Sequence, residues 1–85
     1  VLEEPDVIRM LETSRDFLEE TGDLTGPERM MMAHAIRSGI SLLAQREELS
    51  PSNLVNKASI NASDMPHIVV KKLQAAFITA ESRWN

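Results

Sequence analysis

The sequence contains no cysteine, and none of its apolar runs is long. Without cysteine there are no disulfide bonds and no thiolate metal sites, and a reducing compartment is favoured. The longest weakly polar stretch, residues 30–44, includes His34 and Arg37 and is too short to cross a bilayer. The first four residues lack the basic start and apolar run of a signal peptide. We therefore expect a protein that does not enter a membrane and that resides in the cytoplasm, with the nucleus as the second choice.

Patterns that mark catalysis are also missing. The sequence has no glycine-rich loop that would cradle a phosphate, no nucleophile turn and no His-Glu-x-x-His metal motif. His34 falls on the polar face of a predicted helix, and His67 falls in the first turn of another. Neither histidine has a complementary group at a catalytic spacing. We predict that the protein is not an enzyme, with no catalytic residue, no metal ligand and no cofactor.

What is present suits one small globular unit. The chain has 85 residues, of which 42% are hydrophobic and 26% are charged. We interpret residues 1–85 as a single helical domain. Because the sequence starts without methionine and stops at Trp84-Asn85, we expect it to be a fragment of a larger protein.

The net charge of −4 is unevenly distributed, because residues 1–28 carry −7 and the remainder carries +3. Such an asymmetry can orient a charged partner, although solvated helix faces are commonly charged without binding anything.

All four prolines stand where a helix can begin: Pro5, Pro27, Pro51 and Pro66. Proline is tolerated in a first turn because the opening amides have no intrahelical partner and the fixed φ already suits a helix. Hydrophobic periodicity between these points is helical. The sequence therefore predicts an all-α fold, a small four-helix bundle with helices at approximately 5–20, 27–48, 51–59 and 65–84, of which the third is short.

The long second helix is predicted to lie at the centre of the bundle. Apolar residues cover more than half of its circumference, so more than one neighbouring helix has to cover it. They are Met31, Met32, Ala33, Ala35, Ile36, Ile40, Leu42, Leu43 and Ala44. Gly39 is unfavourable inside a helix, and its arc includes Ala35, so we predict a close approach by another helix there. A dimer contact at Gly39 is the alternative.

The last helix carries two apolar faces. The larger one, centred on Leu73, is predicted to enter the core and comprises Pro66, Val69, Val70, Leu73, Ala76, Phe77, Ala80 and Trp84. The smaller one holds Ile68, Ala75 and Ile78 on the opposite side, beside Lys71. Four helices provide little material to cover both sides of an outer helix. We predict that this smaller face binds a partner, with Met30 of the second helix as a further contact.

Two functions follow as hypotheses. The first is a non-catalytic interaction or assembly module that binds another protein, or another domain of the same chain, through the smaller face. The alternative is a helix-turn-helix-like domain that binds nucleic acid with the second and third helices. Its candidate contacts are Ser52, Asn53, Asn56, Lys57 and Lys72. The negative net charge and the lack of glycine in the turn favour the first hypothesis. The sequence leaves the partner and the oligomeric state open.

Overall fold

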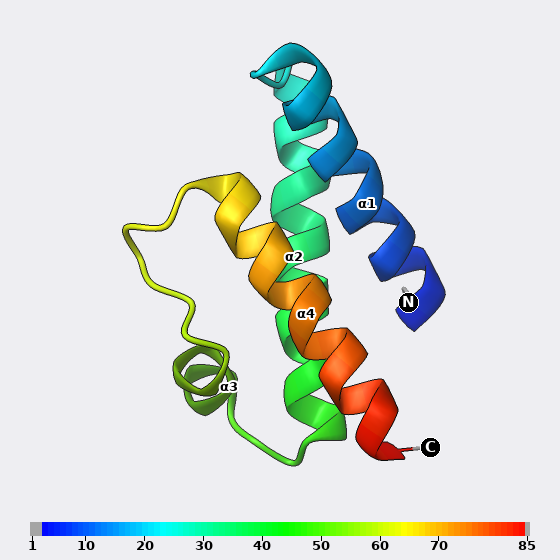
Figure 1. Ribbon diagram of the computed structural model, residues 1–85, viewed down its shortest axis with the longest axis vertical. Coiled ribbons are helices and arrows are strands. Elements are labelled where there is room, and N and C mark those ends of the chain that lie inside the picture. The colour runs from blue at the N-terminus through cyan, green and yellow to red at the C-terminus, as the bar shows by residue number, and fades with distance from the viewer. Residues whose placement is uncertain (1–2, 85) are drawn as a thin grey trace.

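Four helices form the fold of residues 3–84, the part of the chain described by the computed structural model (Figure 1). They are α1 (Glu4–Thr21), α2 (Gly26–Arg46), α3 (Pro51–Lys57) and α4 (Pro66–Trp84), and this part of the chain contains no strand. The predicted all-α fold with a short third helix is confirmed. The side chains of Arg83 and Trp84 are outside the description, so the predicted burial of Trp84 lies outside the described residues.

Local sequence fixes where the helices start. Proline occupies the first turn of α1, α2 and α3 as predicted. Ahead of α3, the hydroxyl of Ser50 accepts a hydrogen bond from the amide N–H of Asn53 at 3.2 Å. Ahead of α2, the amide N–H of Thr25 donates to the Glu28 carboxylate at 3.0 Å. Such contacts satisfy amides that have no partner inside the helix, so the starts can be predicted from sequence.

Two helices end slightly before the approximate positions that the sequence predicted. α2 and α3 each end two residues before the predicted positions 48 and 59. Glu48 and Ser59 adopt left-handed backbone conformations, with φ of 56° and 58°. After α2, the amide N–H of Leu49 then donates to the carbonyl of Ala44 at 2.8 Å. This ending is usually marked by glycine, and the sequence has none at either position, so it gave no signal there.

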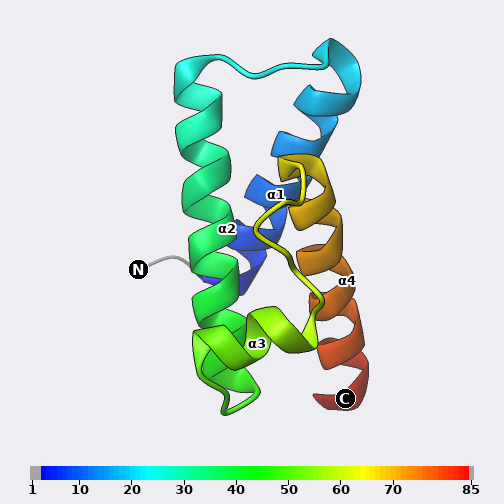
Figure 2. The same cartoon turned by 90° about the vertical axis from the view of Figure 1, so that its left-hand side faces the viewer.

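The prediction that α2 is central is confirmed, because α2 packs against α1, α3 and α4 (Figure 2). Its buried side is centred on Ala35 and Gly39, whereas Ala33, which we placed in the core stripe, is exposed. A methyl group built on Gly39 would lie 3.5 Å from carbons of both Val7 and Phe77. Side chains of α1 and α4 therefore meet over Gly39, as expected for a position of close approach.

The space around Gly39 is large enough for alanine but too small for leucine, so the two substitutions should change the stability in opposite directions. Gly39→Ala is expected to raise the free energy of unfolding by about 0.5–1 kcal/mol, because alanine removes the helix penalty of glycine. Its methyl group would make ordinary contacts with Val7 and Phe77. Gly39→Leu is expected to lower the same quantity by about 1–3 kcal/mol through overpacking. Urea unfolding followed by circular dichroism measures both, and a loss with alanine would contradict the contact geometry.

The larger face of α4 enters the core as predicted. Val70, Leu73, Phe77 and Ala80 are buried, whereas Pro66 is exposed at the start of the helix, contrary to the prediction. α1 packs on α2 and α4 on one side of the molecule (Figure 1). α3 packs on α2 alone within the described chain. A space bounded by α2, α3 and α4 remains open as a result.

Candidate functional site: a groove between α2, α3 and α4

A groove of about 250 Å³ lies where α3 stands away from α4. Its apolar lining includes Leu43 of α2 and Leu54 of α3, both buried, together with three alanines that follow α3 or belong to α4. The complete lining is Leu43, Glu47, Leu54, Lys57, Ala58, Lys72, Ala75, Ala76 and Thr79. The groove exists because α3 is only seven residues long and is held to α2 by one fully buried side chain, Leu54.

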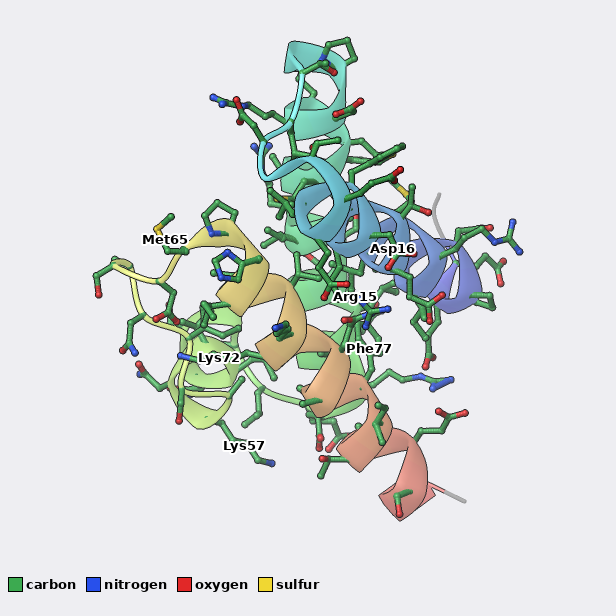
Figure 3. All side chains as sticks on the ribbon, turned by 45° about the horizontal axis from the view of Figure 1, so that its top comes forward. Arg15, Asp16, Lys57, Met65, Lys72 and Phe77 are labelled. Atoms are coloured by element: carbon green, nitrogen blue, oxygen red, sulfur yellow. The ribbon has the colours of Figure 1, made fainter. Side chains whose placement is uncertain are left out.

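Two lysine–carboxylate pairs lie in or beside the groove. The Lys57 ammonium lies 3.9 Å from the Glu47 carboxylate, and the side chain of Lys57 is 51% exposed while that of Glu47 is 14% exposed. The Lys72 ammonium lies 2.6 Å from the Asp64 carboxylate, with side-chain exposures of 27% and 15%. In each pair the carboxylate is the more covered partner. Figure 3 shows Lys57 extending away from α3 and Lys72 extending from α4 toward the α3–α4 connection.

Lys72 also holds the connection between α3 and α4. Its ammonium donates to the Ser59 carbonyl and to the Asp64 carboxylate. The same carboxylate accepts from the amide N–H of Asn61 at 2.9 Å. The Asn61 N–H, followed by the Lys72 ammonium, holds the pKa of Asp64 below its ordinary value. Asp64 therefore stays ionised at neutral pH, and its contribution to the connection is lost only as the pH falls through that lowered pKa.

The predicted partner-binding residues of α4 border the groove. Ala75 lines it directly. Lys71 and Ile78 are exposed on the adjoining side of α4, where Ile78 is 67% exposed, and Ile68 is half-buried. These four residues are spaced so that they share one side of a helix, and we call them the outer strip. The groove and the outer strip form one surface that meets at Ala75.

The structure does not bring Met30 to this surface. Met30 is 75% exposed in the second turn of α2. That end of α2 lies at one end of the molecule, and the C-terminal half of α4 lies at the other (Figures 1 and 2). Grouping Met30 with Ile78 was therefore wrong. Helical periodicity predicts on which side of its own helix a residue lies, but it does not predict how two helices are aligned along their lengths.

The candidate nucleic-acid contacts lie on the outside of α3. Ser52, Asn53, Asn56 and Lys57 are exposed. α3 crosses the C-terminal end of α2 in Figure 2. Lys57 has a carboxylate partner and Lys72 is bound to the α3–α4 connection. Lys72 therefore has two partners inside the protein, whereas Lys57 is 51% exposed beside Glu47. Nucleic-acid binding stays a prediction.

The groove was not predicted from the sequence. Leu43 and Leu54 both line the groove, but their positions 11 residues apart in the sequence gave no sign that they would share one space. Glu47 was not singled out, because a glutamate near a helix end is unremarkable in sequence. No local motif was available to reveal the site. It arises from the angle at which α3 leaves α2.

Among the residues that the structure describes, no three histidine, aspartate or glutamate side chains are grouped to hold a metal ion. None of the described helices has the length and apolar character needed to span a membrane. No family model, curated protein or solved structure matches the chain.

Proposed function

We propose that this protein is an interaction module that binds a helical segment of another protein in the groove between α2, α3 and α4. The observation that carries the proposal is the continuity of the apolar groove with the outer strip through Ala75. A helix laid along α4 would place apolar side chains over Leu43 and Leu54 while its neighbouring turns cover Ile78. This is the helix-in-groove mode of recognition, in which a few anchors at helical spacing enter an apolar cleft.

The size of the groove supports a side-chain occupant over a small molecule. Its volume of about 250 Å³ is below the roughly 300–1,000 Å³ typical of sites for small ligands. One or two apolar side chains fit a space of this size. Protein interfaces of this kind draw most of their affinity from a few anchors in a well-packed pocket, surrounded by contacts that exclude water.

The test is selection of binders from a displayed library of helical peptides. We expect Ala75→Arg to weaken the selected peptides by tenfold or more, because an arginine at the centre of the surface blocks the groove. Ala33→Arg is the matched control, since Ala33 is also an exposed helix alanine but lies outside the groove. Isothermal titration calorimetry measures both variants, and equal affinities would contradict the proposal.

Duplex DNA titrated at low salt is the second arm of this test. A retardation that weakens steeply with salt, and that Asn56→Ala reduces, would favour the nucleic-acid hypothesis instead. Asn56 is suited to that test because its exposed side chain lies on α3 and does not line the groove.

A further inference from the structure

We infer that the helix recognised by this groove is acidic, with carboxylates flanking its apolar anchors. This inference rests on the proposed function and names the class of its partner. The charges around the surface come from three elements and the α3–α4 connection. They are Glu47 immediately after α2, Lys57 on α3, Asp64 in the connection, and Lys71 and Lys72 on α4.

Among these charged side chains, the most exposed ones are positively charged. Glu47 and Asp64 are 14% and 15% exposed, and each is paired with a lysine. Lys57 is 51% exposed, and Lys71 projects from the outer strip in an exposed position. The most exposed of these charges are therefore the ammonium groups of Lys57 and Lys71. Complementary charge of this kind steers association and sets the orientation of the partner.

The acidic surface of the protein faces elsewhere. Most of the exposed carboxylates in the first 28 residues belong to α1, which lies on the opposite side of the α2–α4 layer from α3 (Figure 1). At physiological salt, charges separated by more than about 8 Å of solvent are largely screened. The net charge of −4 consequently does not describe the groove.

The experiment uses two synthetic helical peptides with the same stripe of leucines. Their polar positions carry either glutamate or lysine. We expect the glutamate peptide to bind the wild-type protein about tenfold more tightly at low salt, and this ratio to shrink as salt rises. The double variant Lys57→Gln with Lys71→Gln is expected to remove most of the preference. Arg9→Gln with Arg37→Gln is the matched control, because both arginines are exposed away from the groove and the change in net charge is the same.

The outcomes separate the two proposals. Equal binding of both peptides, blocked by Ala75→Arg, would overturn the acidic partner and leave the proposed function standing. Loss of the preference in the Arg9 and Arg37 control as well would assign it to net charge, and this also overturns the inference. Binding of neither peptide at millimolar concentration, or binding that Ala75→Arg does not affect, would overturn the proposed function itself.

Discussion

Phe77→Ala is expected to lower the free energy of unfolding by about 3–5 kcal/mol, because it removes a large buried ring and leaves a cavity. Phe77 is 3% exposed, and its ring faces Gly39 of α2, where a methyl group built on the glycine would lie 3.5 Å from the ring. A domain of this size has roughly 4–13 kcal/mol of stability in total. The variant should therefore lose a large share of its total stability, which urea or thermal unfolding followed by circular dichroism would measure.

The neighbouring Ile78→Ala is the control for that measurement. Ile78 lies next to Phe77 in α4 but is 67% exposed, so its truncation should change stability by no more than about 0.5 kcal/mol. Equal losses at the two positions would contradict the orientation of α4. The outer strip would then be part of the core, and the proposed binding surface would no longer be available.

Leu54→Ala is expected to detach α3 from α2, with a cost of about 2–5 kcal/mol if the cavity does not collapse. Leu54 is the only fully buried side chain of α3, and α3 packs on no other helix of the described chain. A helix of seven residues is unstable by itself. Hydrogen exchange should therefore lose protection in residues 51–57 first, while α1, α2 and α4 remain protected.

The control for Leu54 is Val55→Ala, which truncates a half-buried neighbour in the same helix and should cost distinctly less. Uniform loss of protection over all four helices in Leu54→Ala would contradict the view that α3 is an appendage of α2. Leu54 also lines the groove, so this variant should lose peptide binding while most of the helical signal is retained. That combination would link the docking of α3 to the binding surface.

The buried faces of α4 and α2 differ in how well the sequence predicts them. The buried face of α4 was predicted from period alone, because Val70, Leu73 and Phe77 recur at helical spacing and exclude charge. The buried face of α2 was predicted less well. Its apolar residues nearly encircle the helix, so periodicity could not tell that Ala33 would be exposed. The packing of α1 and α4 against α2 determines which side of α2 is buried.

The buried hydroxyl of Ser14 is a second case. Its oxygen has no hydrogen-bond partner although the residue is completely buried. Serine is a polar residue type, although its spacing from Val7 and Leu11 places it on their side of the helix. Tertiary packing buries it because it lies on the same side of α1 as Val7 and Leu11. An unsatisfied hydroxyl in a core is unfavourable, so propensity and polarity alone do not predict its location.

The sequence by itself determined the number of helices, their starts and the face of α4 that enters the core, because prolines, capping residues and apolar spacing act within one or two turns of chain. Only the tertiary structure decided which residues far apart in the chain share a surface. The separation of Met30 from Ile78, the opening between α3 and α4, and the pairing of Lys57 with Glu47 and of Lys72 with Asp64 all depend on how the helices pack. These are set by the sum of contacts across the core, which no local pattern records.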